Sequence, residues 1–253
     1  MARRSAIPRS DVPYRTKEQL QDEAALLLAE YGERFKAVTA PPVPVDDILE
    51  CHLKLIFEID DLKKRFGIGD VLGALWINDK TVRVDSSLDP TAHPRMLGRY
   101  RYTLAHETGH WRLHRAYFLE NPDQSKLFGA DGKPVYVCRS TEAKKPVEWQ
   151  ADYFAAHLLM PADLLRAGWQ AWRGSLEPVC LEDLWEEYGE ETVRSEINQR
   201  SDAGRADQFT AASALMEMFV RPLAATFEVS AEAMRIRLEE TGLLLRQRSQ
   251  MLF

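Results

Sequence analysis

The sequence predicts an α+β fold, because helical and strand-like patterns occupy separate stretches of the chain. Apolar residues recur at helical spacing over residues 16–35 and again from residue 148 onward. Between these regions, apolar and polar residues alternate over 53–59, and two further strand-like runs, 71–77 and 81–84, flank a short polar turn. We therefore expect a small antiparallel sheet of three strands, followed by a carboxy-terminal region built mainly from helices.

The composition is that of an ordinary globular protein. The chain has 253 residues and a formal net charge of -6, which argues against a protein that as a whole binds nucleic acid or an anionic membrane. The amino terminus lacks the apolar run of a secretory signal, and no run of about 18 apolar residues predicts a membrane span. Three widely spaced cysteines predict no disulfide framework. We expect a cytoplasmic protein without membrane contacts.

The amino-terminal region divides into a tail and a first helix. Residues 1–15 hold four arginines and two prolines, with little to bury, which predicts a flexible tail. Thr16 and Gln19 form a capping box, and apolar residues then follow at helical spacing as far as Phe35. A short second helix is predicted over 45–52, after a proline-rich stop.

A five-residue pattern, His106-Glu107-Thr108-Gly109-His110, predicts a zinc site. Residues four apart on an α-helix are rotated by about 400°, so the two imidazoles lie one above the other and can reach one ion. Glu107 is rotated by about 100° from His106, where it can take the proton of a water at the metal instead of binding the metal. The predicted cofactor is therefore Zn²⁺.

The residues around this pattern favour a buried helix. No proline interrupts residues 95–115, and apolar residues recur there at helical spacing. Gly109 is unusual, because a glycine inside a helix costs about 1 kcal/mol relative to alanine. We expect another segment to pack closely against the backbone at this position.

A catalytic zinc normally has three protein ligands, so the two histidines need a partner. The candidate is Glu148, which opens a predicted helix that ends at Pro161. Asp152 lies one turn further on the same side and would accept the second ring proton of a ligand histidine. A helix of this kind also commonly exposes its carboxylates to solvent, and the spacing alone does not decide between the two interpretations.

Two stretches resemble, in this order, the paired motifs of the ImmA/IrrE family of metallopeptidases. The first is YTLAHETGH at 102–110, and the second is EWQADYFAA at 148–156 followed by LLMP at 158–161. The resemblance covers about residues 16 to 165 and implies a zincin-like metallopeptidase core with an active-site helix, which we assign to a domain at 16–175.

The resemblance also implies roles for the site residues and a class of substrate. His106, His110 and Glu148 would bind zinc, and Glu107 would be the catalytic acid and base. Asp152 stands where many relatives have asparagine, so its contact with a ligand histidine stays open. In relatives the substrate is often a helix-turn-helix transcriptional repressor, whose cleavage switches on stress-response or mobile-element genes.

Other residues are weaker candidates for the metal site. His114 is rotated by about 80° from His106 and is expected at the end of the helix or in the wall of the pocket, whereas His157 faces away from Glu148 on the same helix. Cys138 is a less suitable ligand than a glutamate for a hydrolytic zinc. The polar segment 120–147 is expected to form a wall or a lid of the cleft, with Tyr136 and Arg139 as candidates for stabilising an oxyanion.

The carboxy-terminal region, 176–253, is predicted to be helical. A polar link over 198–207 leads to two helices, the second capped by Ser230, and this pair resembles the helix-turn-helix unit found after the protease core in the same family. The second helix carries Arg235 and Arg237 but also three glutamates, which would repel phosphates. Packing or partner binding is therefore favoured over direct DNA binding.

These observations predict a zinc-dependent endopeptidase that acts on a protein substrate. One alternative is a regulatory DNA- or protein-binding factor in which the zinc site is structural or vestigial. Another is a toxin-like or adaptor protein that works through its carboxy-terminal helices. The sequence specifies neither the cleaved bond nor the oligomeric state.

Overall fold

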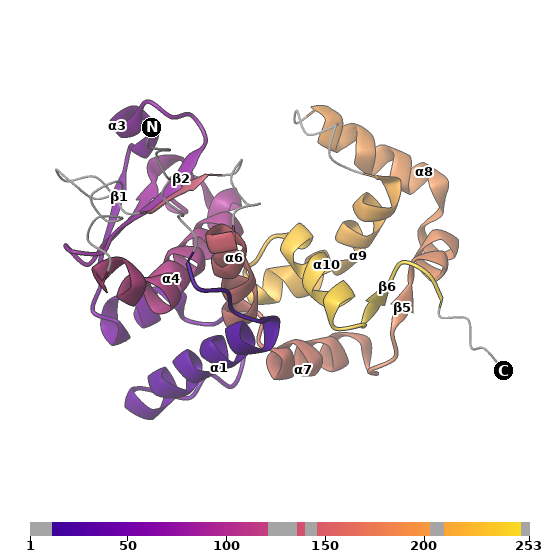
Figure 1. The fold of residues 1–253 in the computed structure, drawn as a ribbon. Coiled ribbons are helices and arrows are strands. Elements are labelled where there is room, and N and C mark those ends of the chain that lie inside the picture. The colour runs from indigo at the N-terminus through magenta and orange to yellow at the C-terminus, as the bar shows by residue number, and fades with distance from the viewer. Residues whose placement is uncertain (1–11, 121–135, 140–145, 203–209, 249–253) are drawn as a thin grey trace, which may run out of the picture. The chain divides into compact units, whose positions relative to one another are not determined.

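The computed structural model describes residues 12–120, 136–139, 146–202 and 210–248, and these form two compact units (Figure 1). The amino-terminal unit comprises Met1–Val38 and Val43–Leu159, and the carboxy-terminal unit comprises Thr39–Pro42 and Met160–Phe253. The first unit combines helices with a sheet and the second is mainly helical, so the α+β class is confirmed. The division after Leu159 comes earlier in the chain than the predicted domain end at 175.

The first helix, α1 (Lys17–Arg34), has the predicted start. The Thr16 side chain accepts a hydrogen bond from the Gln19 backbone, and the Gln19 side chain accepts one from the Thr16 backbone. Four residues of the helix are buried: Leu20, Ala24, Leu27 and Tyr31. Each lies three or four residues from the next, so the amphipathic pattern predicts the buried face correctly.

The predicted tail is shorter than the sequence suggests. Residues 1–11 lie outside the described part of the chain, but Val12 is buried and the Pro13 carbonyl accepts a hydrogen bond from the Gln150 side chain. The prediction of a flexible segment up to residue 15 is therefore wrong for 12–15. The prediction rested on the arginine content of the segment, which gives no sign of the buried Val12 side chain or of the hydrogen bond to the Pro13 carbonyl.

The predicted short helix over 45–52 is confirmed as helical. It begins as α2 (Val45–Asp47) and continues with a wider π-helical turn, Ile48–His52. Val45, Ile48 and Leu49 are buried in it.

The sheet has four strands, and one of its pairings differs from the prediction. The strands are β1 (Ile56–Asp60), β2 (Val71–Trp76), β3 (Thr81–Asp85) and β4 (Tyr136–Arg139), in the order β1-β3-β2-β4. Strand β2 is antiparallel to both β3 and β4, but β1 is parallel to β3, so the prediction of an antiparallel sheet is wrong for β1.

The parallel pairing follows from the connection between β1 and β2. Helix α3 (Leu62–Phe66) separates the two strands, so β1 pairs with β3 and not with the next strand along the chain. Asp61 caps this helix at its start, and Gly67 ends it with a φ of 66°. The predicted alternation in β1 is also only partly correct, because Leu55 is buried whereas Ile59 is 41% exposed.

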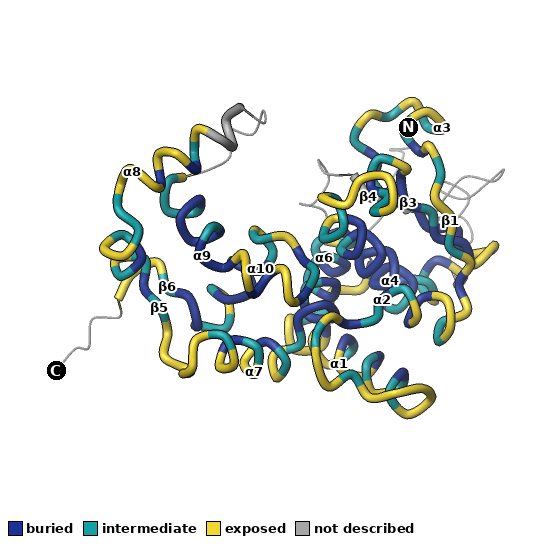
Figure 2. The backbone as a smooth tube through the Cα atoms, turned by 180° about the vertical axis from the view of Figure 1, so that it is seen from behind, coloured by how far each residue is buried: buried dark blue, intermediate teal, exposed yellow. Residues whose placement is uncertain are grey.

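The sheet supports the helix that carries the zinc pattern. Strands β2 and β3 supply a row of buried side chains, and α4 (Leu97–Glu120) packs against both strands. Figure 2 shows the dark blue, buried path of α4 beside the sheet. Two single 3₁₀ turns, Ser86–Leu88 and Pro94–Met96, lead from β3 into α4.

Helix α6 (Pro146–Leu159) packs against α4 at Gly109. A β-carbon at position 109 would lie 3.1 Å from Phe154 Cδ1 and 3.3 Å from both the Ala151 Cα and carbonyl oxygen. The prediction that another segment approaches this backbone is therefore confirmed, because a glycine permits the close contact between the two helices.

Gly109→Val should separate the two helices and weaken the metal site. Overpacking of this kind costs about 1–3 kcal/mol, and here it would also move the helix that carries Glu148. Urea unfolding and zinc titration of the purified variant measure the two effects. Gly69→Val is the matched control, since no atom of the described residues lies within 4 Å of a β-carbon built there. Equal stability and zinc affinity in the two variants would contradict the prediction.

The carboxy-terminal unit contains four helices within its described residues. They are α7 (Ala162–Arg173), α8 (Leu181–Asp202), α9 (Ala211–Phe227) and α10 (Ala231–Glu240). The short strands β5 (Val179–Cys180) and β6 (Leu244–Leu245) pair in parallel. Helix α8 is interrupted at Gly189, where φ is 73°, and it continues to residue 202. The predicted polar link over 198–207 is therefore helical in its first part, and residues 203–209 lie outside the described range.

The last two helices lie near their predicted positions in the sequence. The arginines of the second one, Arg235 and Arg237, form contacts inside the unit. Ser230 caps α10 as predicted, by accepting a hydrogen bond from the Ala233 backbone. Arg235 is 8% exposed and contacts Glu217 at 3.0 Å, and Arg237 is 4% exposed and donates to the Met160 carbonyl. These two arginines therefore stabilise the fold of the unit and do not form a basic surface. None of the helices that the structure describes has the length and apolarity of a membrane span.

Candidate metal centre

The two histidines of the sequence pattern meet inside the amino-terminal unit. Helix α4 places the Nε2 atoms of His106 and His110 2.9 Å apart, and both side chains are almost completely buried. The rings are nearly perpendicular, with an interplanar angle of 79°. The helical spacing of four residues thus brings two nitrogen lone pairs to one point, as the pattern predicts.

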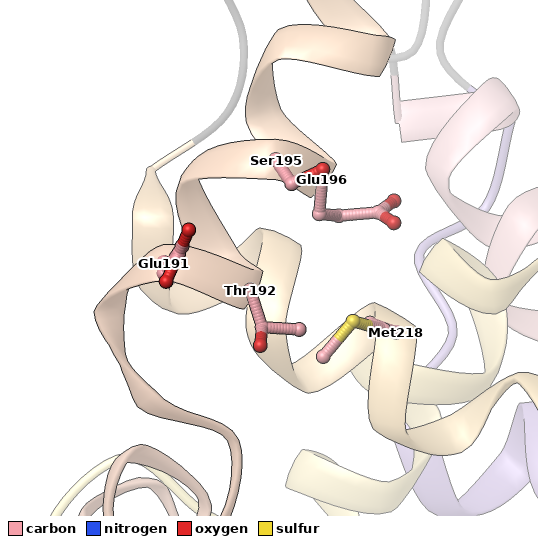
Figure 3. Close-up of a pocket in the computed structure, with 5 residues that line it drawn as sticks. All are labelled: Glu191, Thr192, Ser195, Glu196 and Met218. Atoms are coloured by element: carbon pink, nitrogen blue, oxygen red, sulfur yellow. The ribbon is translucent and has the colours of Figure 1, made fainter.

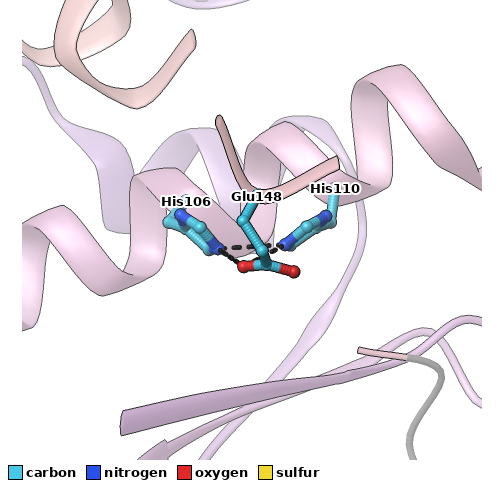
Figure 4. A group of neighbouring side chains, drawn as sticks. All are labelled: His106, His110 and Glu148. Carbon is cyan, nitrogen blue, oxygen red and sulfur yellow. Dashed lines mark hydrogen bonds and ion pairs between the residues drawn. The ribbon is translucent and has the colours of Figure 1, made fainter. Parts of the chain in front are cut away.

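Glu148 joins the two histidines from helix α6. Its Oε2 atom lies 3.1 Å from His106 Nε2 and 3.6 Å from His110 Nε2 (Figure 4). The carboxylate is buried and points between the two rings. The close packing of α6 on α4 at Gly109 makes this contact between two helices possible.

The spacing of the three ligand atoms suits a tetrahedral zinc ion. Zinc bonds of about 2.0–2.1 Å to nitrogen or oxygen place neighbouring ligand atoms about 3.3 Å apart in a tetrahedron. The three distances at this site, 2.9, 3.1 and 3.6 Å, lie around that value. Among the described residues, this is the one group of three or more His, Cys, Asp or Glu side chains that could hold a metal ion.

The electrostatics of the trio favour an ionised Glu148 beside a neutral His110 ring. Burial alone would raise the pKa of Glu148, but the interactions with His110 and His106 outweigh it, so that the pKa lies well below its usual value. Burial lowers the pKa of His110, which keeps its ring neutral. Ionised glutamate and neutral imidazole are the forms that bind a metal.

Asp152 contacts a ligand histidine from one turn beyond Glu148. Its Oδ1 lies 2.9 Å from His106 Nδ1, the ring nitrogen that faces away from Glu148. The Tyr102 hydroxyl donates to the carbonyl oxygen of Asp152 at 3.2 Å. An acceptor at Nδ1 keeps the proton on that nitrogen, so that the lone pair of Nε2 can bind a metal.

Glu107 is completely buried beside the trio and points toward the sheet. Its Oε1 lies 2.7 Å from where a β-carbon at Gly73 would be, so the glycine in β2 provides the space for this carboxylate. Neither carboxylate oxygen has a hydrogen-bond partner among the described residues. Burial raises the pKa of Glu107 to about 8, and nearby His106 only partly opposes this. Such a group is suited to accept and return a proton near neutral pH.

Glu107→Gln should stabilise the metal-free protein, and more at pH 8 than at pH 5. The pKa of Glu107 rises from 4.5 to about 8 on folding, so the unfolded chain loses this proton first as the pH rises. Between pH 4.5 and pH 8 the folded wild type therefore keeps a proton that the unfolded chain has lost. Its free energy of unfolding falls there by at most about 1.4 kcal/mol per pH unit, and that of the variant does not. Urea unfolding of chelator-treated proteins measures the difference. The prediction would be wrong if the free energies of unfolding of the wild type and of Glu107→Gln differed by the same amount at pH 5 and pH 8.

His114 and Gln150 extend the site on the side away from Glu148. His114 is buried, and its Nδ1 lies 3.1 Å from the Nδ1 of His110. Its Nε2 lies 3.3 Å from the Gln150 Oε1. His114 thus contacts one candidate ligand and is not itself part of the trio, as predicted. Gln150 has no signal in the sequence that would have identified it.

The remaining sequence candidates do not join the trio. The ring of His157 contacts the Tyr153 carbonyl and the Gln21 side chain, away from Glu148, as predicted. The side chains of Tyr136, Cys138 and Arg139 lie outside the described part of the structure, although the β4 backbone pairs with β2. The same holds for most of the predicted wall or lid at 120–147, so these predictions stay open.

A separate hollow of about 350 Å³ lies in the carboxy-terminal unit, between α8 and α9 (Figure 3). Five residues line it: Glu191, Thr192, Ser195, Glu196 and Met218. Glu196 forms an ion pair with Arg221. The hollow offers carboxylates without a histidine or cysteine, so it has fewer features of a reactive centre than the trio.

Comparison with known proteins adds no assignment. No protein-family model matches the chain, and no curated protein matches it significantly.

Proposed function

We propose that the protein is a zinc-dependent endopeptidase. The observation that supports this most is the buried trio of His106, His110 and Glu148, whose ligand atoms all lie within 4.8 Å of one another. Two histidines and one carboxylate from two helices are the ligand set of several catalytic zinc sites, in which the fourth position takes water or substrate. The partner of Glu148 on its own helix, Asp152, orients the first histidine.

Zinc bound by this trio would polarise the scissile carbonyl and lower the pKa of a water molecule to about 7. Glu107 is the residue that moves the proton. It follows a candidate ligand in the chain, and its buried carboxylate lies beside Gly73 and close enough to His106 and Glu148 to interact with both electrostatically. In the proposed reaction this carboxylate takes a proton from the water and later returns it to the leaving amine.

The proposed substrate is a protein, as the resemblance to the ImmA/IrrE family implies. A helix-turn-helix transcriptional repressor is the class we propose, with cleavage leading to expression of stress-response or mobile-element genes. We further propose that the carboxy-terminal unit packs against partners and does not read DNA. The burial of Arg235 and Arg237 in contacts within the unit supports this assignment.

The test is proteolysis of a candidate repressor. A candidate helix-turn-helix repressor is mixed with the zinc-loaded protein, and new fragments are identified by mass spectrometry. Cleavage that stops with chelator and returns with zinc supports the proposal. If every repressor of a panel stays intact in the presence of zinc, the proposal of a protease is wrong. The alternative of a regulatory factor with a structural zinc site would then be favoured.

A further inference from the structure

His114 lies at the start of a hydrogen-bonded series that leads away from the metal trio. Its Nδ1 lies 3.1 Å from His110 Nδ1, and its Nε2 lies 3.3 Å from the side-chain oxygen of Gln150. The amide nitrogen of Gln150 in turn donates to the Pro13 carbonyl at 3.2 Å. His114 and Gln150 are both buried, at 1% and 0% exposure.

The protons along this series can be placed in only one consistent way if His110 binds a metal through Nε2. The neutral ring of His110 then carries its proton on Nδ1 and donates it to Nδ1 of His114. A neutral His114 that accepts at Nδ1 carries its own proton on Nε2 and donates it to the Gln150 oxygen. The Gln150 amide is then oriented to donate to the Pro13 carbonyl, which can only accept.

We infer that His114 is a positioning residue that fixes the tautomer and the ring orientation of His110, and that Gln150 and the Pro13 carbonyl hold His114 in its acceptor form. This inference rests on the proposed metal centre. It gives each ligand histidine its own acceptor: the carboxylate of Asp152 for His106 and the imidazole of His114 for His110. Partners of this kind commonly strengthen metal binding by about 10–100-fold.

The difference between the two acceptors has an electrostatic reason. A zinc ion carries two positive charges, and the carboxylates of Glu148 and Asp152 already supply two negative ones. A further carboxylate at the buried position of His114 would add negative charge at a high desolvation cost. A neutral imidazole supplies the acceptor without adding charge.

The experiment compares two replacements of His114 by zinc affinity, measured by chelator competition on the full chain. His114→Asn keeps an acceptor oxygen near the position of Nδ1, whereas His114→Phe keeps a ring and removes the acceptor. We expect the Phe variant to bind zinc about 10–100-fold more weakly and the Asn variant to stay within about threefold of the wild type. His157→Phe is the control, because this histidine is also buried but contacts Tyr153 and Gln21 instead of the trio.

A spectroscopic measurement separates positioning from packing. In nitrogen-15 labelled, zinc-loaded protein, the Nδ1 proton of His110 should give a downfield resonance that persists in the Asn variant and disappears or moves in the Phe variant. Equal zinc affinities of the Asn and Phe variants, or an unshifted resonance in the Phe variant, would overturn the inference. Zinc binding that follows the expected order without any proteolysis would support the role of His114 and count only against the proposed endopeptidase activity.

Discussion

Glu107→Gln is expected to reduce peptide cleavage by about 10²–10⁴-fold while zinc stays bound. The amide has the size of the carboxylate, so it fits the space beside Gly73. It cannot accept a proton at neutral pH, and the step that Glu107 would perform is therefore lost. The ligand atoms of His106, His110 and Glu148 are unchanged, so the affinity for zinc should be preserved.

Two measurements on the same preparation check this result. Metal analysis gives the zinc content, and the initial rate of repressor cleavage gives the activity. Glu50→Gln is the matched control, because Glu50 is exposed and lies outside the trio. A Glu107→Gln protein that cleaves at the wild-type rate would remove this residue from the mechanism.

The features that the sequence predicts well are those set by neighbours along the chain. The capping box at Thr16 fixes the start of α1, and the four-residue spacing places His106 and His110 together, because both depend only on helix geometry. The glycine at 109 predicts a close helix contact for a similar reason. Its cost to helix stability can be recognised from the sequence alone, without knowing which segment makes the contact.

The partner of β1 was harder to predict, because pairing depends on the path of the chain between strands. The cap at Asp61 and the positive φ at Gly67 mark a helix that the strand-like alternation obscured. With that helix between β1 and β2, the first strand pairs in parallel with β3. Local signals thus existed for the helix but not for the choice of partner.

The surroundings of the candidate site come from elements far apart in the sequence. Gly73 on β2 makes space for Glu107, and Gln150 on α6 connects His114 to Pro13. Neither glycine in a strand nor glutamine in a helix is specific to a metal site. Such residues take their places only through packing, so the sequence could predict the candidate ligands but not these neighbours.

Glu148→Ala is expected to weaken zinc binding more than any replacement of the residues that orient the histidines. It removes the one charged candidate ligand and leaves two buried imidazole nitrogens 2.9 Å apart without the carboxylate that faces both of them. The loss should therefore exceed the about 10–100-fold that removal of an orienting partner costs. Cleavage activity should fall with the zinc content, because the variant lacks one of the three ligands of a catalytic site.

Asp152→Asn is the matched comparison, because it changes a carboxylate that contacts a histidine of the trio without removing a candidate ligand. The amide of this variant would keep an oxygen to accept from His106 Nδ1, so its zinc affinity should stay close to that of the wild type, while that of Glu148→Ala falls steeply. Zinc content after dialysis and chelator competition give the order of the two variants. If Glu148→Ala retains full zinc content, Glu148 is not a ligand. The proposal that α4 and α6 together bind one ion through this trio would then be wrong.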